Sequence, residues 1–149
     1  MTRLGNGLYS AGRLKEAQAQ FVDAVVIWRA LVTDGATDFQ NRLVRGLRHL
    51  ADSYKGSDKA EAAKLYEEAI TLGEQTADDP RELAFSLYNL STIRASEGSQ
   101  KVAAVCLERC CDLLNNSIKK GFTRMTEDPH SPALAPILNQ AQNKLRSMG

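Results

Sequence analysis

The residues best suited to bind a ligand form a run of arginines near position 45. Four polar residues are separated by three or four positions and therefore share one face of a helix: Arg45, Arg48, His49 and Asp52. Arg42 stands one turn earlier. Guanidinium groups bind carboxylates through paired hydrogen bonds. This face is a candidate site for an acidic segment or a C-terminal carboxylate, and the alternative is a solvated face that Asp38 or Asp52 partly neutralises.

The three cysteines are the other candidates for chemistry. Cys106 and Cys110 would share a helix face, as two metal ligands would. The sequence offers no third and fourth ligand nearby, because His49 and His130 are distant. Cysteine also packs well as a small apolar residue, so we predict a structural role, no metal site and no cofactor. Without a coupled nucleophile and base or a phosphate-binding loop, an enzyme is not expected.

Composition argues against several other classes of function, although the arginine helix keeps nucleic-acid binding open. The chain has 149 residues and a net charge of +1, which gives no electrostatic case for nucleic acid or an anionic membrane. The N-terminus has no apolar segment of the signal-peptide kind, and no run approaches the roughly 18 apolar residues of a spanning helix. We therefore expect a cytoplasmic protein with reduced cysteines and neither a nucleic-acid nor a membrane partner.

The pattern of apolar residues predicts an all-α fold. Leu, Ala, Glu, Lys, Arg and Gln dominate the stretches between glycine and proline breaks. Seven helices are expected, at about 1–10, 14–33, 38–55, 58–76, 80–96, 99–120 and 132–148. Gly121 suits the position just after a helix, and Pro136 either kinks the last helix or marks its start.

A small–large–small triad recurs on the second, fourth and sixth helices. The three copies are Ala17–Phe21–Ala24, Ala62–Tyr66–Ala69 and Ala103–Leu107–Cys110, and they begin 45 and then 41 residues apart. A small residue lets two antiparallel helices approach closely, and the bulky residue between fills the remaining space. Recurrence at a nearly fixed period indicates a solenoid of helix pairs.

Three segments carry this pattern: LGNGLYSAGRLKEAQAQFVDA, LADSYKGSDKAEAAKLYEEA and LYNLSTIRASEGSQKVAAVCLERC. They resemble the tetratricopeptide repeat (TPR), and the period near 43 is similar to the repeats of kinesin light chains. The third copy departs from the family pattern at Arg94 and Cys110. The resemblance implies a right-handed α-solenoid of three TPR helix pairs, at about 1–34, 38–77 and 80–120. Residues 121–149 would then form a linker and a C-terminal capping helix.

The resemblance also implies a function, because the first helix of each TPR pair lines a concave groove in which peptides lie. The candidate peptide-binding residues are Arg3, Asn6, Arg45, Arg48, His49, Asp52, Tyr88, Asn89 and Thr92. Asn89 stands where many peptide-binding members carry an asparagine that grips the ligand backbone; the alternative is a surface asparagine. We therefore expect a non-catalytic protein–protein interaction module with a peptide partner.

The alternative function is a self-associating scaffold, or a regulatory segment of a larger assembly. Met1 falls a few residues into the usual first helix, so either that helix is short or the chain is a piece of a longer array. The first pair would then leave an apolar edge uncovered. Such an edge recruits a partner, and a homo-oligomer would be one outcome.

Overall fold

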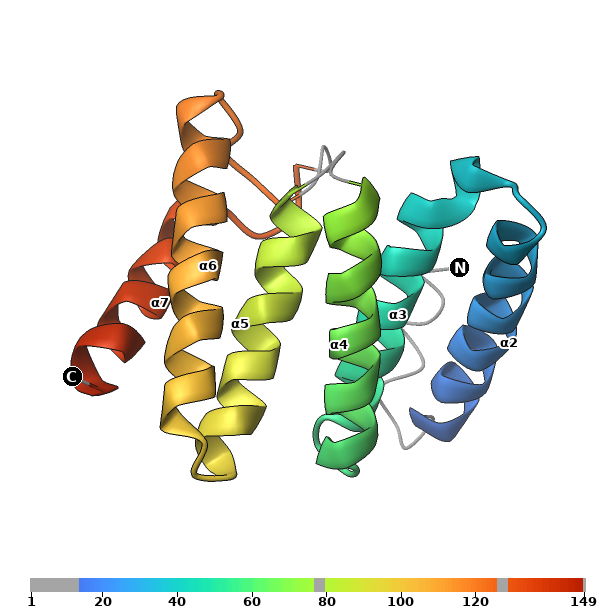
Figure 1. The fold of residues 1–149 in the computed structure, drawn as a ribbon, viewed down its shortest axis with the longest axis horizontal. Helices are drawn as coiled ribbons and strands as arrows, with labels where there is room; N and C mark the ends of the chain where they lie inside the picture. Colours follow the sequence, from blue (N-terminus) through green and yellow to red (C-terminus); the bar gives the residue numbers. More distant parts are fainter. Residues whose placement is uncertain (1–13, 77–79, 126–128, 149) are drawn as a thin grey trace. The chain divides into compact units, whose positions relative to one another are not determined.

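The computed structural model describes residues 14–76, 80–125 and 129–148, and these are almost entirely helical (Figure 1). In chain order the α-helices are α2 (Leu14–Thr33), α3 (Gln40–Tyr54), α4 (Lys59–Thr76), α5 (Pro80–Ser96), α6 (Gln100–Lys119) and α7 (Leu134–Met148). A short 3-10 helix, η1 (Thr37–Phe39), precedes α3. Within these ranges no strand forms, although Arg124 and Ala133 make one isolated bridge. The all-α prediction is confirmed, and the helix expected at 1–10 lies outside the described residues.

Glycines end three of the helices by the same hydrogen-bonding pattern. Gly121 has a φ of 98° and follows α6. Its N–H donates to the carbonyl of Ile118 at 3.0 Å, and the next N–H, of Phe122, donates to Ser117 at 3.0 Å. This pair of bonds satisfies the last helical carbonyls and needs a left-handed residue, which glycine supplies without a steric cost. Gly35 and Gly98 also have positive φ and end α2 and α5 in this way.

Pro136 is the third residue of α7, which begins at Leu134. The first N–H groups of a helix have no partner within it, so a proline there removes no backbone hydrogen bond. Of the two sequence alternatives, the start of the helix is therefore the one observed.

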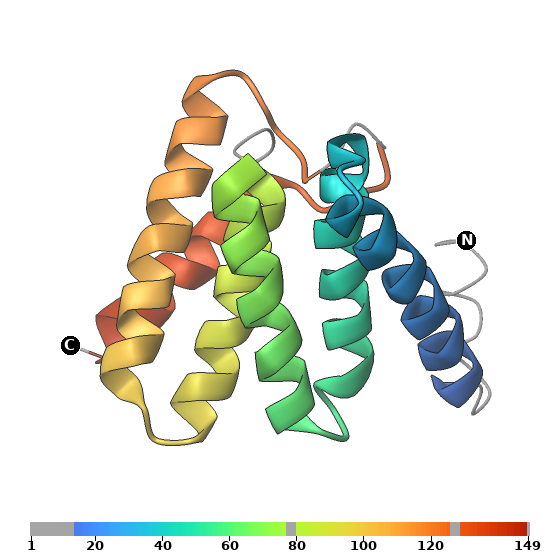
Figure 2. The same cartoon turned by 45° about the vertical axis from the view of Figure 1, so that its right-hand side comes forward.

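The chain divides into two compact units, residues 1–72 and 73–149. In the first unit α2 and α3 run antiparallel and pack together (Figure 2). In the second unit α5 and α6 form an antiparallel hairpin, and α7 packs against α6. Each unit has an apolar core of its own, with Phe21, Leu47 and Tyr66 in the first and Leu107 and Leu134 in the second.

The recurring triads supply much of this core. All nine triad side chains are buried, and none is more than 9% exposed. They lie on α2, α4 and α6, which are the long helices of 20, 18 and 20 residues. The small residues thus occur where helices pack closely, and the helix packing is repeat-like, as the triads predict.

A glycine brings α2 and α3 close together in the first unit. A Cβ placed on Gly46 of α3 would lie 2.6 Å from Cζ3 and 2.9 Å from Cε3 of Trp28 on α2. Real side chains do not approach this closely, so the indole ring occupies the space that any other residue at position 46 would need. Trp28 is half-buried and Gly46 is buried.

No helix among the described residues is long and apolar enough to cross a lipid bilayer.

Candidate functional site

The candidate residues fall into two clusters in different units. Arg45, Arg48, His49 and Asp52 lie on α3 in the first unit, and Tyr88, Asn89 and Thr92 lie on α5 in the second. Arg3 and Asn6 belong to the part of the chain outside the described residues.

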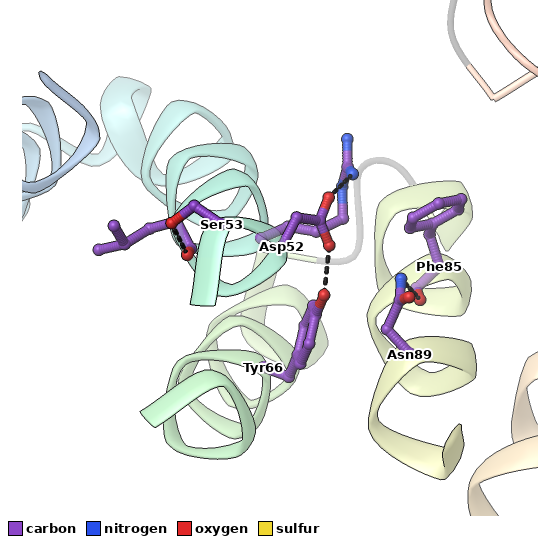
Figure 3. A network of polar contacts seen from close by, with 7 residues as sticks. Asp52, Ser53, Tyr66, Phe85 and Asn89 are labelled. Atoms are coloured by element: carbon purple, nitrogen blue, oxygen red, sulfur yellow. Dashed lines mark hydrogen bonds and ion pairs between the residues drawn. The ribbon is translucent and has the colours of Figure 1, made fainter. Parts of the chain in front are cut away.

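Asp52 is the centre of a polar network on α3 (Figure 3). Arg48 Nη1 lies 3.0 Å from Asp52 Oδ2, an ion pair across one helical turn. The Tyr66 hydroxyl, from α4, donates a hydrogen bond to Asp52 Oδ1. Tyr66 is fully buried, and a buried phenol needs such an acceptor. Its side chain therefore combines the packing role that the triad predicts with a polar role that the sequence did not reveal.

This network engages the guanidinium group of Arg48. Its side chain is only 12% exposed, and its guanidinium is paired with Asp52 of the same helix. Arg48 can meet an external carboxylate only in competition with Asp52. The alternative stated for this face, in which Asp52 partly neutralises it, thus describes Arg48 well.

The other residues of the α3 cluster differ in their surroundings. The imidazole of His49 stacks on the ring of Phe21 from α2, with centroids 5.7 Å apart and planes 9° apart. The Arg42 guanidinium lies 5.3 Å from the centroid of Phe39, a cation–π distance. Arg45 is exposed to solvent. Arg42 and Arg45 are thus the exposed charged residues of this helix.

The charge of α3 is positive after its own ion pair is counted. The helix carries Arg42, Arg45 and Arg48 against the single carboxylate of Asp52, so three positive charges and one negative leave +2 with neutral histidine. At the exposed surface Asp38, which stands in η1 one turn before Arg42, partly balances Arg42 and Arg45. The remaining positive charge attracts anions, and salt weakens the attraction.

The side chain of Asn89 on α5 is buried and does not project into solvent. It is 6% exposed, and its Nδ2 donates to the carbonyl of Phe85 at 3.0 Å, one turn earlier (Figure 3). Asparagine commonly bonds its own backbone in this way. One donor of the amide is thus used internally.

Side chains of α7 contact the other two candidates on α5. The Tyr88 hydroxyl donates to Oε1 of Gln140 at 3.3 Å. Lys144 Nζ lies 4.4 Å from the Tyr88 ring centroid and donates to Thr92 Oγ1 at 3.0 Å. The face of α5 that carries Tyr88 and Thr92 is therefore in contact with the last helix. Nothing in the sequence signals the contact between Tyr88 and Gln140, because these residues are 52 positions apart and meet only through the packing of two helices.

A buried arginine holds the connection between α6 and α7. Arg81, 6% exposed, donates from Nη1 to the carbonyl of Arg124 at 2.8 Å, and its guanidinium lies 4.3 Å from the Phe122 ring centroid. Within the connection the N–H of Leu134 donates to Thr123 at 2.8 Å. Arg81 is thus a structural residue that ties the start of α5 to this loop.

The three cysteines are buried residues of α6. Cys106, Cys110 and Cys111 are free thiols and buried. Burial raises the pKa of the Cys110 thiol to about 12, with smaller contributions from Cys111 and Cys106. Burial also raises the pKa of Cys111. In the part of the chain that the structure describes, no three His, Cys, Asp or Glu side chains are grouped so that they could hold a metal ion.

Comparison with models of known protein families finds no match to the chain, and comparison with curated proteins finds none either.

Proposed function

We propose that the chain is a non-catalytic protein–protein interaction module of tetratricopeptide-like helix pairs, arranged as a right-handed solenoid. Its ligand is an acidic peptide segment, and the arginine face of α3 receives it. The support for the repeats is the burial of all nine triad side chains on three long helices.

The positive surface of α3 is the single observation that carries the peptide proposal. Arg42 and Arg45 are both exposed and stand three residues apart on one helix. Their guanidinium groups can each form two parallel hydrogen bonds with a carboxylate. The Arg48–Asp52 ion pair lies beside them on the same helix, and the hydrogen bond from Tyr66 fixes the position of Asp52.

Charge reversal at the exposed arginines tests the proposal. The probe is a fluorescein-labelled hexaglutamate peptide, and its anisotropy is followed against protein concentration. Arg42→Glu with Arg45→Glu should weaken binding at least about tenfold, because a rim charge governs attraction of an opposite charge. Arg48 is left unchanged, because reversing it would place a carboxylate beside Asp52 and perturb the fold.

A matched double reversal in the other unit provides the control. Lys119→Glu with Lys120→Glu alters the net charge by the same amount at exposed positions of α6 and its C-terminal end. Binding of the probe by this control should stay close to that of the unaltered chain. If both double variants lose binding equally, attraction of the peptide depends on net charge alone, and the assignment of the binding site to α3 is wrong.

One observation favours the alternative of self-association. Three apolar side chains on α2 are exposed: Val22 at 36%, Val26 at 56% and Ile27 at 58%. Adjacent exposed apolar residues of this size often mark a contact surface. Light scattering over a range of protein concentrations tests this alternative, and a mass that stays at one chain throughout would exclude it.

A further inference from the structure

A pocket of about 530 Å³ opens in the second unit, where α5 and α7 end and α6 begins. Ligand sites in proteins commonly have volumes of roughly 300–1,000 Å³, so this pocket is large enough for a small molecule or for one residue of a peptide. It lies on α5, α6 and α7, and none of its residues belongs to the α3 surface.

Lys144 supplies the charge of the pocket. Its ammonium group is positioned by the Thr92 hydroxyl at 3.0 Å and by the Tyr88 ring, whose centroid is 4.4 Å away. An ammonium group has three N–H donors, and Thr92 accepts one of them. The described residues that line the pocket include no carboxylate. A charged donor with spare hydrogen-bonding capacity therefore borders the pocket.

The hydroxyl groups of the lining have a different role. Ser91 donates to the carbonyl of Tyr88 at 2.5 Å, and Ser147 donates to the carbonyl of Lys144 at 2.7 Å. Each hydroxyl proton is directed into its own helix, which leaves the hydroxyl oxygens as acceptors. Gln100 also lines the pocket, and its Nε2 donates to the carbonyl of Ala95 at 3.4 Å. Ala95 and Met148 supply the apolar part of the wall.

These features define one class of ligand. We infer that the pocket binds a carboxylate attached to a short apolar group, with the carboxylate on Lys144 and the apolar group against Ala95 and Met148. The C-terminal residue of a peptide has this chemistry, and so does a free N-acyl amino acid. The inference concerns a different unit from the α3 surface and does not rest on the peptide proposal.

The test compares two probes that differ only in charge. N-acetyl-leucine and N-acetyl-leucinamide have the same side chain, but only the first has a carboxylate. Each is titrated into the full ¹⁵N-labelled chain, and amide chemical shifts are followed. The acid should cause saturable shifts centred on Thr92, Ala95 and Lys144. The amide should bind roughly fivefold more weakly, the scale of one partly exposed charge pair.

Three variants assign the effect to the ammonium group. Lys144→Gln should weaken the acid roughly fivefold, whereas Lys144→Arg, which keeps the charge, should stay within about twofold of the unaltered chain. Lys119→Gln removes an exposed lysine at the other end of α6 and should change nothing. If Lys144→Gln fails to fold, the acid–amide comparison on the unaltered chain still decides the result.

Several outcomes would overturn the inference. Shifts that do not saturate up to the solubility limit of the acid would do so, as would equal binding of the acid and the amide. Unchanged binding of the acid by a folded Lys144→Gln variant would do the same. An acetylated tetrapeptide that ends in a free leucine distinguishes the two sources: tighter binding than N-acetyl-leucine indicates a peptide terminus, and equal binding indicates that the free acid suffices.

Discussion

Replacement of Gly46 by alanine should change the free energy of unfolding in two opposite ways, through helix propensity and through a clash with Trp28. Alanine favours a helix over glycine by about 1 kcal/mol. The added methyl would, however, lie 2.6 Å and 2.9 Å from two carbons of the Trp28 ring. Overpacking of this kind costs about 1–3 kcal/mol. Because Trp28 is half-buried and its ring can partly yield, we expect a net loss of about 1 kcal/mol, or about 3 °C in Tm.

Urea unfolding measures this loss, and the single tryptophan of the chain reports it directly by fluorescence. The decisive control is the same substitution in a Trp28→Leu background, followed by circular dichroism. Without the indole ring the clash disappears, so Gly46→Ala should stabilise that background by up to about 1 kcal/mol. If Gly46→Ala stabilises the unaltered chain as well, the ring does not press on α3 and the reasoning is refuted.

Three further predictions are tested by urea unfolding. Arg81→Met should cost about 2 kcal/mol, because it removes a part-buried hydrogen bond and a cation–π contact. Arg94→Met on the same helix breaks a partly exposed ion pair and should cost under about 0.5 kcal/mol, and equal costs would refute the structural role of Arg81. Tyr66→Phe should cost about 1–2 kcal/mol in the unaltered chain and clearly less in an Asp52→Ala background, since the hydroxyl bonds that carboxylate. The Cys110 pKa rises from 9.0 to about 12 on folding, so the thiol should leave stability unaffected below pH 9 and lower it between pH 9 and 12, by up to about 1.4 kcal/mol per pH unit. Cys110→Ala should make this decline shallower, and parallel curves would contradict the assignment.

Much of the fold could be predicted from local signals in the sequence. The second helix was predicted at 14–33, and α2 has those bounds. The third begins two residues later than expected, because residues 37–39 form a 3-10 turn first. These boundaries are set by glycine and by residues adjacent in the chain, which explains why a single sequence reveals them.

The candidate site was harder to predict, because its contacts join residues that are distant in the chain. Periodicity identified the shared face of Arg48 and Asp52, since both lie on one helix. It could not identify Tyr66 as a partner of Asp52, because that bond depends on how α4 packs against α3. The contact of Lys144 with Thr92 likewise depends on the side-chain geometry of two separate helices.

The concealed thiols of α6 have a practical consequence for spectroscopy. All three cysteines of the chain are shielded within the folded unit, and thiol reagents attack the thiolate form. A cysteine engineered at an outward-facing position, for example Lys64→Cys, would therefore react far faster than the native three. Spin labels or fluorophores could then be attached at chosen points in the native sequence background, and distances between them would report how the two halves of the chain are oriented in solution.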